Sequence, residues 1–354
     1  MMAKIIYLDP GLPHYRIDIY DYFKQRFDQI GHKFMVIYDI SKMTTAEKFP
    51  FIRGVQYSFK DLVRIIKIEK PDIILSIIGL NYTFFFPFFL YARLHGIKNI
   101  FRAHGINLSR SKNLLSQLPY HIRNFIADAI ILYSKNEVQY VIKSKDQIFV
   151  ANNTLNYRHF IEVKEDKLTL KEKYGIPFKR AVLFCGRILP RKRLDILVDA
   201  FLYNKDKMSK YAMLIVGDGL SEAQKALIQS EPNIFYFGKV YDKLKLAEIF
   251  CISDVFCIPG SSGLSINHAF FYGLPYITTM CQHGPEICYV KSGINGYILS
   301  DSSPRKLGEI LEDLLENDSD LTRMSMHAKE TLFKEASIEG MFQGYLKAIS
   351  MFVK

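Results

Sequence analysis

Short apolar segments alternate with longer amphipathic segments along nearly the whole chain. The apolar segments have the length of buried strands, and the segments between them repeat apolar residues at helical spacing. Strands are predicted at residues 5–8, 33–38, 73–78, 100–103, 129–133, 147–150, 181–185, 212–216, 234–237, 255–258 and 276–278. Helices are predicted at residues 17–30, 60–69, 194–201, 222–230, 243–252, 264–272 and 304–315. This alternation is typical of parallel sheets that helices cover on both faces.

The alternation runs twice, which predicts two doubly wound α/β domains. A chain of 354 residues is about twice the usual length of one domain. Asn152-Asn153-Thr154 ends the first series, and a charged stretch at 163–173 precedes the second. We expect an N-terminal domain at 1–160 and a C-terminal domain at 161–336. An amphipathic closing helix is expected at 337–354, packing back on the N-terminal domain.

The segment at 73–92 is apolar enough to be considered as a membrane span. Gly79, Asn81 and Pro87 interrupt it near its middle. We therefore predict a buried strand, a loop, and a hydrophobic helix that runs toward Gly96.

Composition narrows the class of protein further. Hydrophobic residues make up 49% of the chain and charged residues 23%, which excludes global disorder. The five cysteines are odd in number and form no CxxC pair, so a disulfide framework or zinc site is not expected. The N-terminus has the pattern of a first strand rather than a signal peptide. These features fit a cytoplasmic protein.

The net charge of +11 is unevenly distributed. Residues 1–160 carry 22 Lys and Arg against 12 Asp and Glu, while the rest of the chain is nearly balanced. A basic N-terminal half predicts an acidic partner, such as anionic lipid, a phosphorylated acceptor or nucleic acid. A merely solvated basic surface is the alternative. No nucleic-acid recognition motif is present, so nucleic acid is not expected as a partner.

Three predicted strands in the second half end in loops whose residues are suited to phosphate. The first loop, GRILPRK at 186–192, brings Arg187 and Lys192 close to a glycine turn. The second is VGDG at 216–219, which fits either a plain turn or a close backbone approach. The third, PGSSGLSINHAFFYGLP at 259–275, passes from a strand through small residues into a helix. Free amides at such a helix start attract phosphate.

These loops, with FYFGKV at 235–240 and HGPEICYVKSGINGYI at 283–298, resemble the family 4 retaining glycosyltransferases. The resemblance covers most of the chain and is strongest from 181 to 298. It implies the GT-B fold, in which two Rossmann-like, doubly wound parallel-sheet domains face each other across a cleft. It also implies a nucleotide-sugar donor, a UDP- or GDP-sugar, bound in the second domain.

The resemblance assigns roles to individual residues. Arg187 and Lys192 match the pyrophosphate-binding pair and, with His104 after a first-domain strand, are the catalytic candidates. The remaining donor-binding candidates are Gly11, Gly186, Lys239, Val240, Gly260, Ser262, Gly263, Leu264, His268 and Glu286. Lys239 and Val240 match a segment that holds the base through its backbone, and Gly263 and Leu264 match the turn that meets the phosphate and donor sugar.

One departure from the family pattern is clear. The family carries two glutamates separated by seven residues, and this chain has Gly260 and His268 at those positions. A histidine can still hydrogen-bond a ribose hydroxyl, whereas a glycine has no side chain to contact the donor sugar. Glu286 lies nearby in the sequence, but its presence alone does not make it a replacement.

We expect a glycosyltransferase that moves a sugar to a saccharide or lipid-linked saccharide, with retention, in cell-surface polysaccharide or glycolipid synthesis. Preorganised cations and backbone amides would stabilise the leaving group, with no metal or other cofactor. The basic first half and two aromatic helices, 82–94 and 114–125, predict peripheral attachment to the inner face of the cell membrane, unless those aromatics belong to the core. The alternatives are a GT-B scaffold with lost or weak catalysis, and a GT-B epimerase or phosphorylase.

Overall fold

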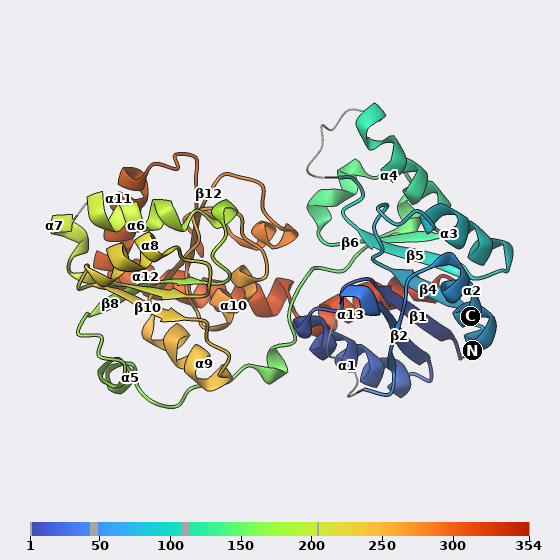
Figure 1. Ribbon diagram of the computed structural model, residues 1–354, viewed down its shortest axis with the longest axis horizontal. Coiled ribbons are helices and arrows are strands. Elements are labelled where there is room, and N and C mark those ends of the chain that lie inside the picture. Colours follow the sequence, from blue (N-terminus) through green and yellow to red (C-terminus); the bar gives the residue numbers. More distant parts are fainter. Residues whose placement is uncertain (1, 43–48, 108–113, 204, 354) are drawn as a thin grey trace. The chain divides into compact units, whose positions relative to one another are not determined.

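The structure is a computed structural model that describes residues 2–42, 49–107, 114–203 and 205–353. The chain divides into two units, shown in Figure 1. The first consists of residues 1–156 and 337–354, and the second of residues 157–336. Each unit is a parallel sheet covered by helices.

The first unit contains a seven-stranded sheet with the order β3-β2-β1-β4-β5-β6-β7. All its strand pairs are parallel. The strands are β1 (Lys4–Asp9), β2 (Lys33–Asp39), β3 (Ile52–Val55), β4 (Ile73–Ser76), β5 (Lys98–Ala103), β6 (Ala129–Leu132) and β7 (Ile148–Val150). The helices are α1 (His14–Gln29), α2 (Phe59–Glu69), α3 (Phe85–Leu94), α4 (Leu114–Ile126) and α13 (Ile338–Ser350).

Alternate residues of these strands point to opposite faces of the sheet, and each face has its own core. On one face, residues such as Ile5 and Ile100 pack with Phe23 of α1 and Phe342 of α13. On the other face, residues such as Ile6 pack with α2 and α3. The near-continuous apolar strands are therefore buried on both sides.

The C-terminal helix α13 is part of the first unit. Gly344 brings it against the end of β7, where a Cβ atom would lie 2.4 Å from the carbonyl oxygen of Val150. Phe342 and Tyr345 pack edge-on against Phe23 at ring-centroid distances of 5.5 and 4.9 Å. The chain thus returns to its first domain after completing the second.

The second unit contains a six-stranded sheet with the order β10-β9-β8-β11-β12-β13. Its strands, all parallel, are β8 (Arg180–Cys185), β9 (Tyr211–Val216), β10 (Ile234–Gly238), β11 (Val255–Cys257), β12 (Tyr276–Thr279) and β13 (Gly296–Leu299). Its helices are α5 (Lys167–Lys173), α6 (Leu194–Tyr203), α7 (Lys205–Met208), α8 (Glu222–Gln229), α9 (Lys243–Ile252), α10 (Ser265–Phe271), α11 (Pro304–Glu316) and α12 (Asp318–Glu335).

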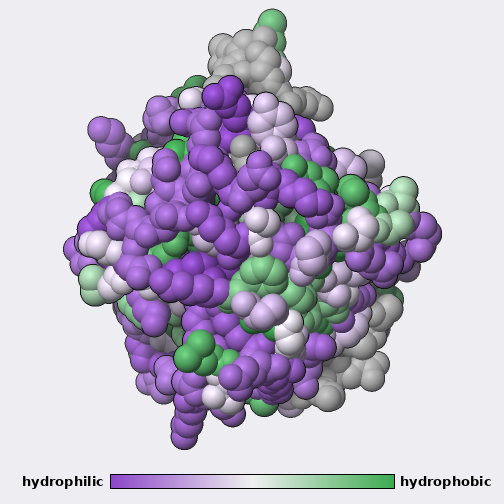
Figure 2. Space-filling view, turned by 90° about the vertical axis from the view of Figure 1, so that its left-hand side faces the viewer, coloured by the Kyte–Doolittle hydropathy of each residue, from purple (hydrophilic) through white to green (hydrophobic). Residues whose placement is uncertain are grey.

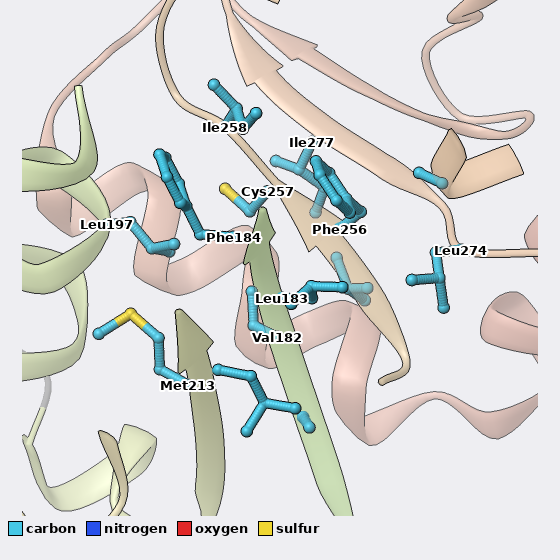
Figure 3. Close-up of a cluster of buried hydrophobic side chains, with 14 of the residues drawn as sticks. Val182, Leu183, Phe184, Leu197, Met213, Phe256, Cys257, Ile258, Leu274 and Ile277 are labelled. Carbon is cyan, nitrogen blue, oxygen red and sulfur yellow. The ribbon is translucent and has the colours of Figure 1, made fainter. Parts of the chain in front are cut away.

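Helices cover both faces of this second sheet (Figure 1). Helix α6 packs on α11, and α10 packs on α12. Figure 3 shows part of the enclosed core, in which Phe184 of β8, Phe256 of β11 and Ile277 of β12 are fully buried. Both sheets contain the Rossmann strand order 3-2-1-4-5-6. The strands are all parallel, but the chain adds strands on one side of the first strand and then, from the fourth strand on, on its other side.

Every strand and helix listed from the sequence pattern is present, with small shifts at the ends. The pattern did not predict β3, β13, α5, α7 or α12. Strand β3 is interrupted by Arg53 and Gly54, β13 has only four residues and begins with a glycine, and α12 is largely polar. The apolar segment at 73–92 forms β4, a loop and the start of α3, as predicted.

Among the described residues, no helix combines the length and apolar character needed to cross a bilayer. The face of the molecule shown in Figure 2 is mainly hydrophilic, with apolar residues in small groups.

Candidate functional site

The candidate donor residues lie along one edge of the second sheet. In a parallel sheet all carboxyl ends meet at the same edge, and ligands bind there at the point where the strand order reverses. In this sheet that point lies between β8 and β11. The loop at 186–192 follows β8 and the loop at 258–264 follows β11, so the structure brings the two main phosphate-binding candidates together.

Lys192 lies directly over Gly186. A Cβ atom at Gly186 would be 2.4 Å from the Lys192 Nζ, so the glycine leaves room for the amine. Burial lowers the pKa of Lys192, and the nearby Arg191 and Arg187 lower it further. Arg187 is exposed. Neither Arg187 nor Lys192 has a carboxylate partner in the part of the chain that the structure describes. Two cations without counter-ions at this edge form a site for an anion.

Two backbone hydrogen bonds join the β8 and β11 loops. The amide of Gly260 donates to the carbonyl of Lys192 at 3.0 Å, and the amide of Ser261 donates to that of Arg191 at 2.8 Å. A Cβ atom at Gly260 would lie 2.2 Å from the Arg191 carbonyl oxygen. A glutamate side chain therefore does not fit at position 260 in this geometry. The close contact between the two loops requires a glycine there.

The VGDG segment also makes a close approach. Cβ atoms at Gly217 and Gly219 would lie 2.1 Å from the carbonyl oxygen of Gly186 and 2.3 Å from that of Ile188. Both glycines have positive φ. Of the two interpretations left open by the sequence, close packing against the β8 loop is the one observed. It holds the backbone that carries Arg187.

A network of hydrogen bonds stabilises the loop that follows β11. The Ser262 hydroxyl accepts from the Tyr276 hydroxyl at 2.8 Å and donates to the carbonyl of Gly260 at 3.1 Å. The Ser262 amide donates to Nδ1 of His283, whose Nε2 donates to the carbonyl of Thr279. Ser262 is thus buried, and its hydrogen bonds stabilise the loop itself. His283 belongs to the HGPE motif, but the motif alone did not reveal this supporting contact.

Glu286 lies beside the same loop. Its Oε2 atom would be 3.6 Å from a Cβ atom at Gly263, and the residue is 3% exposed. The structure therefore brings a carboxylate to the turn that the sequence assigned to the donor. Gly263 and Leu264 precede α10, which has only seven residues. Any anion binding here therefore depends on the loop amides and the cations rather than on a long helix.

The segment assigned to the base follows the outer strand of the same edge. Lys239 and Val240 come directly after β10, and the carbonyl of Gly238 accepts from the amide of Gly217. The Lys239 amine lies over the ring of Tyr241 at 4.7 Å. Val240 packs partly into the core. This segment therefore borders the VGDG loop.

His268 lies in an aromatic cluster. Its ring stacks on Phe250 with a centroid distance of 4.3 Å and contacts Phe160 and Tyr272. Part of the residue remains accessible, yet burial among these rings lowers the pKa of His268 to about 4. The imidazole is neutral at neutral pH, which permits a hydroxyl contact but no charge on the donor.

In the first unit, His104 follows β5 and is held by a carboxylate. Its Nδ1 lies 2.5 Å from Oε1 of Glu137, while Oε2 of Glu137 accepts from the amides of Tyr133 and Ser134. When the imidazole is neutral, this contact favours the tautomer with the proton on Nδ1 and an acceptor at Nε2. Glu137 was not predicted from the sequence. The Ser134-x-x-Glu137 spacing of a capping box is the signal that could have found it.

Gly11 lies in the loop after β1. Its amide donates to Oδ1 of Asp9 at 3.1 Å, and a Cβ atom there would meet no other atom within 4 Å. The space beside it is open, as a close approach by a ligand requires. Gly11 and His104 belong to the first unit, and the other candidates belong to the second.

Comparisons with known proteins identify the class. Residues 179–317, most of the second unit, match the family model described as glycosyl transferases group 1. A crystal structure of a glycosyltransferase from Rickettsia africae superposes with a TM-score of 0.74 at 18% identity, covering 100% of this chain and 99% of that one. Anabaena HepE, crystallised with UDP, gives 0.76 at 17% identity, covering 98% and 100%.

The protein thus has the GT-B fold, and residues 179–317 are similar to the group 1 glycosyl transferases. Together these findings support a glycosyltransferase. The fold is shared more widely: a putative UDP-N-acetylglucosamine 2-epimerase from Listeria monocytogenes gives a TM-score of 0.68 at 13% identity, covering 99% and 96%. The group 1 domain, rather than the fold, therefore favours a transferase over an epimerase. A comparison with curated proteins gives no match.

The Gly260 contact leads to a stability prediction. Gly260→Glu should lower the melting temperature and weaken nucleotide binding, because its Cβ atom would overlap the Arg191 carbonyl. Overpacking of this kind costs about 1–3 kcal/mol or more. Thermal unfolding with and without UDP would measure both effects. Gly263→Ala is the control for stability, since its Cβ atom meets only Glu286 at 3.6 Å. A Gly260→Glu protein as stable as the wild type would contradict this account of the loop.

Proposed function

We propose that the protein transfers a sugar, with retention, from a nucleotide-diphosphate sugar to a saccharide or lipid-linked saccharide acceptor in cell-surface polysaccharide or glycolipid synthesis. The observation that carries the proposal is the pair Arg187 and Lys192, two cations without a carboxylate partner among the described residues at the point where the strand order reverses. A pyrophosphate has the charge and the two-centre shape that suit this pair.

A UDP- or GDP-sugar is the proposed donor. Anabaena HepE, which shares the fold, has been crystallised with UDP and with UDP-glucose, which supports a uridine nucleotide as the first to test. The nucleotide would lie along the carboxyl edge of the second unit, with its base beside Lys239 and Val240 and its phosphates near Gly186 and Gly263.

The proposed chemistry is electrostatic. Negative charge grows on the leaving pyrophosphate as the glycosidic bond breaks, and Arg187 and Lys192 would stabilise that charge in place of a metal ion. Glu286, beside Gly263, would contact the donor sugar in the role that Gly260 cannot take. His268 would offer a neutral imidazole to the ribose. His104, oriented by Glu137, would bind a hydroxyl of the transferred sugar.

An exposed apolar stripe supports a membrane-bound acceptor. On α4, Leu115, Leu118, Ile122 and Phe125 follow helical spacing, and Leu115 and Phe125 are 84% and 79% exposed. Leu90 and Leu94 of α3 are also exposed, although Phe85, Phe88 and Phe89 of the same helix are core. The alternative that the aromatics are core thus holds for Phe85, Phe88 and Phe89 of α3, whereas Phe125 of α4 is on the surface.

Basic residues accompany this stripe. The Arg93 guanidinium of α3 is exposed and donates to the carbonyl of Ile126 at the end of α4, so it joins the two helices. Together with the excess of Lys and Arg in residues 1–160, this places positive charge near apolar side chains. We propose that α3 and α4 attach the protein to an anionic membrane surface at the cytoplasmic face.

Arg187→Ala tests the donor site. We expect turnover to fall about 10²–10³-fold, which corresponds to about 3 kcal/mol of transition-state stabilisation. The reason is that the variant lacks the positive charge that stabilises the leaving pyrophosphate. A thermal-shift screen of UDP-, GDP- and ADP-sugars would identify the donor, and product formation would then be followed in EDTA to test the absence of a metal requirement. Arg191→Ala is the matched control, since that neighbouring side chain is exposed. Donor binding without any turnover in the wild type would favour the scaffold alternative.

The lowered pKa of Lys192 predicts a pH dependence of UDP binding. Below that pKa the amine is charged and affinity is full; as pH rises through it, the free protein loses the proton and affinity falls. A bound pyrophosphate raises the pKa again, so binding at alkaline pH should take up a proton. Titration calorimetry in two buffers of different ionisation enthalpy measures this uptake, and Lys192→Met should abolish it. A UDP affinity that is constant up to pH 10 would refute this role.

Vesicle flotation tests the membrane proposal. The wild type should float with anionic vesicles at low salt, and the double variant Leu115→Ser, Phe125→Ser should bind at least tenfold more weakly, a loss of about 1.4 kcal/mol. Leu168→Ser on α5 is the control, because Leu168 is similarly exposed but lies in the second unit. Equal flotation of the double variant and the wild type would exclude α4 as the contact.

A further inference from the structure

A small polar cavity opens at the carboxyl edge of the first sheet. Its volume is about 40 Å³, and its polar walls include Tyr7, Tyr15, Arg16, Arg102, Tyr133 and Tyr345. These residues come from β1, α1, β5, the β6 end and α13, all of the first unit. Since parallel sheets bind ligands at this edge, the cavity lies where a ligand group is expected.

Arg102 is the unusual residue of this cavity. It is 5% exposed, and its guanidinium lies over the rings of Tyr133 and Tyr345 at 4.4 and 5.0 Å. Nη2 donates to Oδ1 of Asn153 at 2.9 Å. Nη1 is buried and has no hydrogen-bond acceptor among the described residues, and no ion pair with Arg102 is found among them. Arginine remains charged in proteins, so the cavity contains a buried cation without a counter-ion.

The second arginine of the cavity does not need an outside anion. Nη1 of Arg16 donates to both carboxylate oxygens of Asp9, at 2.8 and 2.9 Å. Asp9 is fully buried and also accepts from the hydroxyl of Tyr20. The negative charge of Asp9 thus neutralises the positive charge of Arg16. The positive charge of Arg102 remains without a counter-ion. An unpaired buried charge is costly, so such a site gains by binding an anion.

The cavity adjoins the catalytic candidate of the first unit. The ring of Tyr133 packs against His104 with a ring-centroid distance of 4.6 Å, and the Arg102 guanidinium lies over the same ring. Arg102 is the next-to-last residue of β5, and His104 follows directly after the strand. A group held by Arg102 would therefore belong to a molecule that reaches His104.

We propose that Arg102 binds a carboxylate of the acceptor, so that the acceptor is an acidic sugar. This inference rests on the proposed transferase function. One water needs about 10–15 Å³ of such a cavity, so 40 Å³ holds a group of about three heavy atoms. A carboxylate has three heavy atoms, whereas a phosphate has five. The planar guanidinium pairs with a carboxylate through parallel hydrogen bonds, and Nη1, which has no acceptor among the described residues, is available for one of them.

The test compares methyl glucuronide with methyl glucoside, which differ in the carboxylate. We expect titration of the full-length wild type to show at least tenfold tighter binding of the glucuronide, and Arg102→Gln to remove that preference while UDP binding is retained. Arg123→Gln is the matched control, a buried arginine of the same unit outside this cavity. Should Arg102→Gln fail to fold, the two glycosides still test the proposal on the wild type alone.

Equal binding of the two glycosides, or a preference that survives Arg102→Gln, would overturn the proposal. Acetate supplies a further arm: if it binds as tightly as the glucuronide, the cavity recognises a free carboxylate and the acidic-sugar assignment fails. The donor screen is independent of these results. A glucuronide preference without nucleotide-sugar binding would refute the transferase proposal while leaving the carboxylate site in place.

Discussion

Two hydrogen bonds between backbone atoms hold the donor side of this protein together. The amides of Gly260 and Ser261 bind the carbonyls of Lys192 and Arg191, and they form only because residue 260 lacks a side chain. The bonds fix the turn that carries Lys192 over Gly186. The VGDG glycines support the same turn from the β9 side. Position 260 therefore accepts no side chain, because the backbone of Arg191 and Lys192 occupies the space.

Positive charge without a carboxylate partner lies at the ligand-binding edge of each unit. Some lysines and arginines elsewhere have carboxylate partners, as in the pairs Lys173–Glu248 and Arg180–Asp254. Arg187 and Lys192 in the second unit, and Arg102 in the first, have none among the described residues. Desolvated or crowded cations are costly to keep without counter-ions, so both edges are prepared for anionic groups before any ligand arrives.

The sequence was informative about the donor side and less so about the acceptor side, for a physical reason. Strands that are buried on both faces give continuous apolar runs, and loops that cradle phosphate require glycine beside cations, so both leave local patterns. The cavity around Arg102 depends on residues from β1, α1, β5 and α13, which no local window brings together. Glu137 and His283 were missed because each acts by orienting another group. Gly260 was interpreted from the family pattern, whereas its reason is a contact with Arg191, a residue far away in the sequence.

The position of α13 has a consequence for how the protein is made. The first unit is completed only by residues 337–354, while the roughly 180 residues of the second unit lie between them and the rest of that domain. At about 5–20 residues per second, a ribosome needs about 10–40 s to cross that distance. During this time Phe23 and Phe27 of α1, and the sheet face on which α1 packs, lack the covering helix α13. The emerging chain would therefore depend on chaperones, or on the ribosome surface, until the last helix is released.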